Sequence, residues 1–268
     1  MTFILKEKQQ AMKKAAEEFA TGSKIEDVMK KYNVSYASIY NALKRYNIQY
    51  KYTYGRTIFF NENYFETIDT EEKAYWLGFL FADGCIELSD KKCSTHNRLS
   101  IGLSVKDLTQ LERFAKAIEM PVEQIRHIFP KHSYSCSEMV YLSCNSIKMC
   151  NDLKALNCTP QKSLHSVFPP IKQEYQRHFI RGYFDGDGCI SRSFEITSDG
   201  HMLHQIQQIL MSACDLKATQ IRYRKHSYNL RYGGKLQLER IFHYLYDNAT
   251  IYMQRKYDKF HSTVFTVS

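Results

Sequence analysis

A short segment occurs twice in this chain, and this repetition limits the fold more than any other sequence feature. WLGFLFADGCI covers residues 76–86 and FIRGYFDGDGCI covers residues 179–190, so that Asp83 and Asp187 lie 104 positions apart. Shorter echoes follow in the same order at 124–126 and 220–222 (both QIR) and at 161–163 and 255–257 (QKS and RKY). Similar segments that recur in order predict two copies of one structural unit, each of roughly 95 residues.

Each copy predicts the order helix, two strands, helix, two strands, helix. The first copy predicts helices at 71–84, 107–118 and 146–156, with strands at 85–90, 98–106, 124–131 and 138–144. The second predicts helices at 173–187, 200–213 and 235–246, with strands at 189–192, 194–198, 219–226 and 228–233. Asp69, three residues before Glu72, resembles a capping-box start for the first helix. Helices packed against antiparallel strands predict an α+β fold.

A small helical head precedes the repeats. Helices are expected at 3–21, 24–32 and 36–46, and Ser35 is a suitable N-cap for the third. Three short helices with a tight second turn resemble a helix-turn-helix module, although a small bundle with a solvated basic face would give a similar pattern. The third helix would present six side chains to DNA: Tyr36, Ser38, Tyr40, Asn41, Lys44 and Arg45. The expected domains are a head at 1–50, a linker at 51–70, and repeats at 71–170 and 171–268.

The charge balance points to a polyanionic partner. The 268 residues carry 37 Lys and Arg against 28 Asp and Glu, a formal net charge of +9. Nucleic acid is the first candidate for such a surplus, and an anionic membrane the second. The longest apolar run has nine residues, 74–82, whereas a bilayer span needs about twenty. With neither a membrane span nor a secretory signal in view, we expect a cytoplasmic protein whose eight cysteines are reduced thiols.

The repeated helices carry the residues expected to do chemistry. Small residues recur one turn apart in each helix, Gly78 with Ala82 and Gly182 with Gly186, so the two backbones can approach closely. Packing at these positions would bring the helix ends together, and with them the carboxylates of Asp83 and Asp187. Neighbouring carboxylates are costly unless a cation lies between them, and Mg²⁺ prefers oxygen ligands. Such a metal can activate both the attacking water and the scissile phosphate.

The segments 77–84 (LGFLFADG) and 181–188 (RGYFDGDG) resemble the paired motifs of the LAGLIDADG homing endonucleases. The chain is most similar to the single-chain type with two motifs, here with an added helix-turn-helix as in phage or mobile-intron members. The resemblance implies two pseudo-symmetric αββαββα repeats that form an antiparallel β saddle in the DNA major groove. It also implies metal-dependent hydrolysis of double-stranded DNA at a long asymmetric site, using Mg²⁺, with Mn²⁺ as a substitute.

The resemblance assigns roles to particular residues. The last Asp of each motif is the metal ligand, which gives Asp83 and Asp187, with the backbone at Gly84 and Gly188 as further candidate ligands. Asp185 corresponds to Phe81 and is not a shared ligand. Basic residues near the scissile phosphates match Lys162 and Lys256 through the QKS and RKY echo, and a weaker polar pair matches Asp107 and Asp199. The strand arginines expected to contact DNA are Arg126, Arg192, Arg222, Arg224 and Arg231, with Arg192 and Arg231 on neighbouring strands.

Two other functions remain open at this stage. A DNA-binding regulator could keep the fold without cleavage, although both motif aspartates are present here. An intron maturase would use the same fold to bind RNA, but the helix-turn-helix head favours duplex DNA. The internal repeat supplies the symmetry that a single-motif relative would obtain by dimerising, so we expect a monomer.

Overall fold

The chain divides into two compact units, residues 1–58 and 59–268. The computed structural model describes residues 2–23, 25–48, 58–88, 97–129, 138–160, 166–224 and 227–265. Within these ranges no helix is both long enough and apolar enough to cross a membrane.

The first unit is a three-helix head, made of α1 (Thr2–Ala20), α2 (Ile25–Tyr32) and α3 (Tyr36–Arg45). The Ser35 side chain accepts a hydrogen bond from the Ser38 amide and caps α3, as the sequence predicted. Small and branched apolar residues from all three helices form its core: Ala15, Ala16, Val28, Ile39, Ala42 and Leu43.

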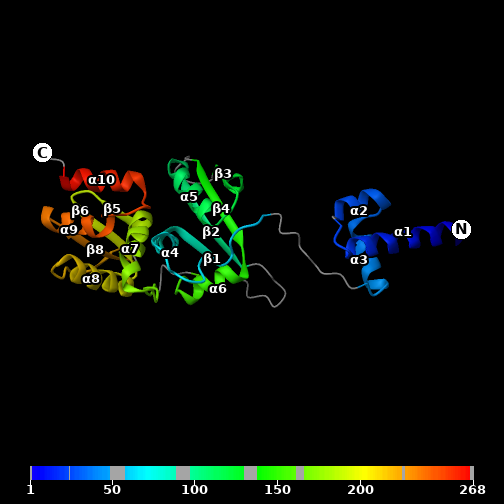
Figure 1. Ribbon diagram of the computed structural model, residues 1–268, viewed down its shortest axis with the longest axis horizontal. Coiled ribbons are helices and arrows are strands. Elements are labelled where there is room, and N and C mark those ends of the chain that lie inside the picture. The colour runs from blue at the N-terminus through cyan, green and yellow to red at the C-terminus, as the bar shows by residue number, and fades with distance from the viewer. Residues whose placement is uncertain are drawn as a thin grey trace. The chain divides into compact units, whose positions relative to one another are not determined.

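The second unit contains the two repeats. The first has α4 (Glu71–Asp83), β1 (Gly84–Glu87), β2 (Arg98–Ser104), α5 (Leu108–Ala117), β3 (Arg126–Ile128), β4 (Met139–Asn145) and α6 (Ile147–Ala155). The second has α7 (Gln173–Asp187), β5 (Gly188–Ile190), β6 (Ser193–Ser198), α8 (Gly200–Cys214), β7 (Arg222–Arg224), β8 (Ser227–Gly233), α9 (Lys235–Tyr246) and α10 (Gln254–Phe265). Both follow the predicted αββαββα order, and α4 and α7 lie side by side between the two sheets (Figure 1).

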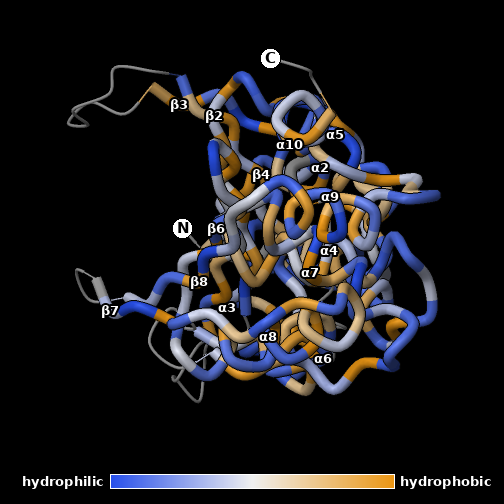
Figure 2. Tube along the Cα trace, turned by 90° about the vertical axis from the view of Figure 1, so that its left-hand side faces the viewer, coloured by the Kyte–Doolittle hydropathy of each residue, from blue (hydrophilic) through white to orange (hydrophobic). Residues whose placement is uncertain are grey.

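The two sheets are built alike. Their strand orders are β1-β2-β4-β3 and β5-β6-β8-β7, and all pairs are antiparallel. The registers correspond as well, because Gly84 pairs with Ile101 in one sheet and Gly188 with Ile196 in the other. Alternate residues such as Ile101 and Ile196 are buried toward the helices, which leaves the opposite face of each sheet to the outside. Strands β3 and β7 project from the same side of the unit (Figure 2).

Several local expectations need correction. Thr70, not Asp69, caps α4 by accepting from the Lys73 amide, while Asp69 forms an ion pair with the Lys73 ammonium. A 3₁₀ turn, Val122–Gln124, stands where the third strand was expected to begin. Arg192 lies in the bend between β5 and β6 rather than on a strand. Helix α10 was not predicted, although Lys256, Phe260 and Val264 are buried in it at a spacing of four residues.

Candidate active site

The helices α4 and α7 pack so closely that their glycines touch backbone. A Cβ added at Gly78 would lie 2.0 Å from the Phe179 carbonyl oxygen, and one at Gly182 would lie 1.9 Å from that of Tyr75. Phe179 stands 104 positions after Tyr75, so the two contacts are related by the internal repeat. A Cβ added at Gly186 would lie 2.2 Å from the Ala82 Cβ, so this glycine also packs directly against α4. All four predicted interface residues therefore lie in the α4–α7 contact.

The helix ends bring the motif aspartates to this contact. A Cβ at Gly186 would lie 3.1 Å from Asp83 Oδ2, and Gly186 directly precedes Asp187. Asp83 is partly exposed and Asp187 is exposed. The adjoining Gly84 and Gly188 have extended backbones, with φ of −78° and −82°. Glycine is needed there for close contact rather than for a left-handed turn, because a Cβ would meet the preceding helical turn at 2.6 Å and 2.1 Å.

The two sides of the helix interface differ in chemistry. On one side Phe81 packs edge-on against Phe179, with ring centroids 5.1 Å apart. At the repeat-related place on the other side, the Tyr75 hydroxyl donates to Asp185 Oδ2 at 2.8 Å. The Met253 amide also donates to this carboxylate, at 2.7 Å. Burial raises the pKa of Asp185 to about 6 despite these donors.

A buried arginine extends the polar side of the interface. Arg181 is fully buried and donates to the carbonyls of Ile251 and Leu245 at 2.8 and 2.7 Å, and to Glu71 Oε1 at 2.6 Å. Glu71 also accepts from the Thr250 amide. Burial lowers the pKa of the Arg181 guanidinium, while the Glu71 carboxylate opposes that shift. Because Glu71 belongs to the first repeat and Arg181 to the second, this pair joins the two repeats.

Lys256 was predicted to lie near a scissile phosphate, and in the structure its side chain binds backbone carbonyl groups. Its ammonium donates to the carbonyls of Phe184, at 2.8 Å, Gly186, at 3.2 Å, and Gly188. These bonds engage all three donors of a lysine, and the side chain is buried. Burial lowers its pKa, and the negative charges of Asp185 and Asp83 oppose that shift. In this structure Lys256 holds the last turn of α7 in place, and it engages the Gly188 carbonyl that the sequence suggested for metal. Lys162 lies outside the described residues.

The adjacent residue, Arg255, is the exposed base of this region that sequence reasoning did not single out. Its guanidinium makes two hydrogen bonds to the Asp107 carboxylate, at 2.7 and 2.9 Å. Asp107 raises the pKa of Arg255 through this pairing, and Asp83 adds to the same shift. Asp199 accepts from the His201 amide and caps α8. Asp107 and Asp199, the predicted polar pair, therefore each form hydrogen bonds with other groups of the protein.

The donor set at the helix ends suits a hard divalent cation only in part. Asp83 and Asp187 supply carboxylate oxygens, the ligand type that Mg²⁺ and Mn²⁺ accept. Among the described residues there is no cluster of three or more His, Cys, Asp or Glu side chains that could hold a metal. A cation here would depend on oxygens from elsewhere, and DNA phosphate and water are the kind that Mg²⁺ commonly keeps.

The outward faces of the sheets carry the predicted strand arginines. Arg126 on β3 pairs in register with Tyr141, and Arg222 on β7 pairs with Asn229 at the corresponding place. Both arginines are exposed. Arg231 is also exposed and belongs to β8, while the side chain of Arg224 lies outside the described residues.

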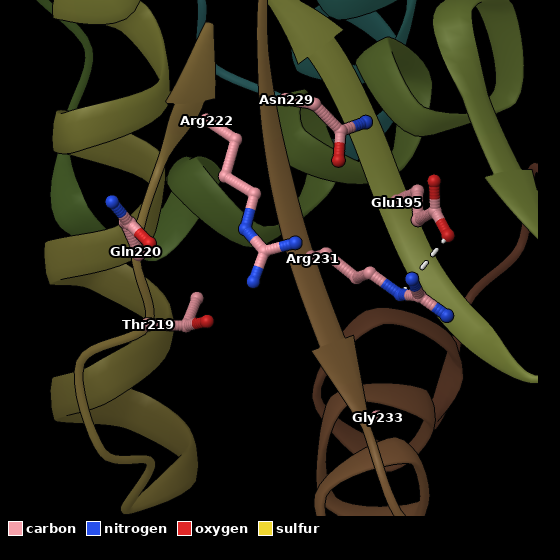
Figure 3. Close-up of a pocket in the computed structure, with 7 residues that line it drawn as sticks. All are labelled: Glu195, Thr219, Gln220, Arg222, Asn229, Arg231 and Gly233. Carbon is pink, nitrogen blue, oxygen red and sulfur yellow. Dashed lines mark ion pairs between the residues drawn. The ribbon is translucent and has the colours of Figure 1, made fainter.

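A polar hollow of about 300 Å³ lies on the second sheet. Its lining consists of Glu195, Thr219, Gln220, Arg222, Asn229, Arg231 and Gly233, none of them an apolar side chain. Figure 3 shows Arg222 reaching from β7 toward β8 and Arg231 reaching from β8 toward Glu195 on β6. Glu195 and Arg231 form an ion pair at 3.3 Å. Sequence reasoning missed Glu195, because the cross-strand register that pairs it with Arg231 is not visible in the sequence.

In the head, helix α3 exposes most of the side chains that the sequence assigned to DNA. Asn41, Lys44 and Arg45 are exposed, and Tyr36 is 49% exposed. Tyr40 differs from the expectation, because it packs against the head core with its ring edge-on to Phe19. Ser38 is half-buried, and its hydroxyl hydrogen bonds to that of Ser35 at 2.8 Å.

Comparison with known proteins gives one family match. A model described as a LAGLIDADG-like domain matches residues 174–262. Among solved structures, the homing endonuclease I-DmoI, as mesophilic variants, is 16% identical, with a TM-score of 0.48 over 66% of this chain and 96% of that chain. The LAGLIDADG meganuclease I-AabMI, bound to uncleaved DNA, is 12% identical, with a TM-score of 0.44 over 70% of this chain and 87% of that one. A search of curated proteins finds no match.

The family match begins in α7 and ends in α10, so it spans the second copy of the motif and its whole sheet. The first repeat has the same order of helices and strands and the same sheet topology. The second repeat is therefore similar to a LAGLIDADG-like domain, and the first repeat is its structural counterpart within the same chain.

Proposed function

We propose that this protein is a site-specific endonuclease that hydrolyses phosphodiester bonds of double-stranded DNA with a divalent metal. The observation that carries the proposal is the α4–α7 contact, where Asp83 lies against Gly186, the residue before Asp187. Paired carboxylates at the ends of two tightly packed helices would hold a divalent metal, and the net charge of +9 suits a polyanionic substrate. The two sheets would follow the DNA groove on either side.

In this proposal Asp83 and Asp187 hold Mg²⁺, with Mn²⁺ as an alternative. The metal, when bound, would lower the pKa of a coordinated water and neutralise charge on the phosphate. Arg255, held by Asp107, would add positive charge beside Asp83. Lys256 would act as a positioning residue, since it binds the carbonyls of the turn that ends at Asp187. Lys162 is proposed to lie near the other scissile phosphate.

The remaining expectations complete the proposal. The exposed α3 side chains of the head would contact DNA as a helix-turn-helix, and the arginines of both sheets would read a long asymmetric site. Differences between the sheets support the asymmetry, since Tyr141 in the first corresponds to Asn229 in the second. The protein would act as a monomer, encoded within or beside a mobile element.

A cleavage assay tests the proposal. The purified full chain with Mg²⁺ is mixed with a plasmid library of genomic DNA, and products are mapped by sequencing. We expect discrete double-strand cuts that EDTA abolishes and that Asp83→Asn or Asp187→Asn reduces by at least about 1,000-fold, because the metal contribution is lost. Asp215→Asn is the matched control, since it makes the same change at an exposed carboxylate that ends α8, and Asn tolerates the left-handed conformation of that residue.

Binding separates a chemical role of the aspartates from a structural one. Asp83→Asn and Asp187→Asn should both bind intact DNA that contains the identified target sequence with the wild-type affinity, measured in EDTA by fluorescence anisotropy. If binding falls as far as cutting does, the aspartates are structural and the proposal is wrong.

A DNA-binding regulator without nuclease activity is the second candidate. Two observations favour it: the described residues contain no three-ligand metal cluster, and Lys256 is fully engaged with carbonyls. Sequence-specific retention of DNA without any cut, by a wild-type protein with a normal melting curve, would establish it.

A further inference from the structure

We propose that Arg231 reads a guanine in the major groove and that Glu195 and Ser193 are positioning residues that fix its guanidinium for this task. The proposal rests on the proposed binding of DNA by the second sheet, and it names the residue there that determines one base of the target. It requires no cleavage, so it can be tested apart from the nuclease chemistry.

Three side chains on two strands form the arrangement. The Arg231 Nε donates to Ser193 Oγ at 3.0 Å, and the Ser193 hydroxyl donates in turn to Glu195 Oε1 at 2.6 Å. The same carboxylate oxygen lies 3.3 Å from Arg231 Nε. Glu195 and Arg231 are register partners on β6 and β8, so the strand pairing itself sets their separation. The guanidinium is therefore held by its inner nitrogen.

The outer edge of this guanidinium stays available. Within the described ranges, the structure gives Nη1 and Nη2 of Arg231 no protein partner, and the side chain is 58% exposed. Two parallel N–H donors at that edge match the O6 and N7 acceptors of guanine, the commonest specific contact of arginine in the major groove. Because Glu195 would repel a phosphate placed beside it, the pair favours an uncharged base edge over the DNA backbone.

Two other strand arginines lack this combination. Arg98 on β2 binds Glu87 through Nη2, at 2.8 and 2.7 Å, so one of its two outer nitrogens is occupied, while its Nε has no hydrogen-bond partner among the described residues. Arg222 lines the same hollow as Arg231 but has no acidic partner among the described residues. An unrestrained arginine loses more side-chain entropy on binding and contacts phosphate as readily as bases. Arg231 is the one of these three with a fixed inner nitrogen and an accessible outer edge.

The first sheet differs at the corresponding position. There Ser100 and Ser143 are the register partners at the place that Glu195 and Arg231 occupy in the second. The guanine contact should therefore exist in only one half of the target, whichever bases the remaining side chains read.

The test selects bound DNA from a fully randomised double-stranded library in EDTA, using the full chain. The proteins are the wild type, Arg231→Lys, Glu195→Ala and Glu195→Gln. Glu87→Ala is the matched control, because it frees an arginine from a cross-strand glutamate in the first sheet. We expect the wild type to enrich a G·C pair at one position of the selected DNA. In Arg231→Lys and Glu195→Ala, the preference for this G·C pair over other base pairs should fall at least about tenfold. All other positions, and the melting temperature, should be unchanged.

The remaining variants decide what Glu195 does. Glu195→Gln keeps a hydrogen-bond acceptor for Ser193 and should retain part of the guanine preference, whereas Glu87→Ala should retain all of it. If Glu195→Ala keeps the wild-type preference while Arg231→Lys loses it, Glu195 does not position Arg231. If Arg231→Lys leaves every position unchanged, or the wild type enriches no sequence, the guanine contact does not exist. The cleavage assay reports separately on Asp83 and Asp187.

Discussion

At the scale of single residues, the glycines of the helix contact occupy positions where no side chain fits without a shift of the backbone. Gly78 and Gly182 place one helix backbone directly against the other. The sequence predicted this contact, because small residues one turn apart on two related segments favour close packing of the helices that carry them. It did not predict why Gly84 and Gly188 are needed, since close packing against the preceding turn depends on the path of the strand that follows.

Gly182→Ala should destabilise the protein by about 3 kcal/mol, because the added Cβ would overlap the Tyr75 carbonyl and force the helices apart. Chemical denaturation measures the loss. Gly233→Ala is the control, as its Cβ would have its nearest neighbour 4.0 Å away. Equal stability of Gly182→Ala and the wild type would contradict the described helix contact.

Lys256→Met should lower the free energy of unfolding by about 3 kcal/mol, because three carbonyl groups lose their donor in a buried place. Thermal and chemical denaturation measure this loss. Lys259→Met on the same helix is the control, since Lys259 is exposed. A Lys256→Met variant with normal stability and no cleavage would instead assign the lysine to the phosphate.

Residues of this kind mark the limit of sequence reasoning here. The QKS and RKY echo singled out Lys256, but it did not indicate the three carbonyl groups that this lysine binds. Its carbonyl partners lie about seventy positions earlier in the chain, and only the return of α10 to the end of α7 brings them together. A contact between distant segments leaves no periodic pattern in either of them.

At the scale of elements, the two motif helices are related by the repeat but are not equivalent. Phe81 and Phe179 pack together on one side, whereas Asp185 and Tyr75 hydrogen bond on the other. The sequence showed that Asp185 stands where the first copy has Phe81, so the position is not one that the two copies share. It could not show that the carboxylate is fully buried.

Asp185→Asn should remove a pH dependence of stability. Burial raises the folded-state pKa of Asp185 from 3.8 to about 6. The contribution of the protonated Asp185 side chain to the free energy of unfolding is therefore fully present below about pH 4 and is lost as the pH rises through 6. Between pH 4 and 7, the free energy of unfolding of the wild type should fall by about 3 kcal/mol relative to that of the variant. Urea denaturation at several pH values measures this difference.

The comparison of these two proteins isolates Asp185. His178, whose pKa burial lowers to about 4, has the opposite effect on stability over part of this range, but it is present in both. A constant difference between wild type and Asp185→Asn across the pH series would mean that Asp185 titrates normally.

At the scale of the whole molecule, the head and the paired repeats are separate compact units. The sequence predicted the three head helices and the order of elements in both repeats, because amphipathic spacing and turn residues are local signals. It did not predict α10, whose buried residues recur at four-residue spacing in a strongly polar segment.

Residues 59–268 alone should fold with the melting temperature of the repeats in the full chain, because their core lies within that unit. Without the head, the proposed DNA affinity should fall and its dependence on salt should weaken, since fewer phosphates are neutralised. Calorimetry and salt-dependent anisotropy measure the two effects. An unchanged affinity and salt slope would show that the head does not contact DNA.

The full chain should sediment as a monomer at micromolar concentration, because α4 and α7 already cover one another within one chain. Analytical ultracentrifugation tests this expectation, and a stable dimer would contradict it.

The unequal helix interface has a consequence for how such chains can recombine. Two copies of the second repeat, paired with each other, would place Asp185 against Phe179 twice, leaving a buried carboxylate without its tyrosine donor. Two copies of the first would place Phe81 against Tyr75, which involves no charge. Gene shuffling that exchanges halves between relatives is therefore directional: the second half needs a partner with tyrosine at the place of Tyr75, whereas the first half accepts a wider range of partners.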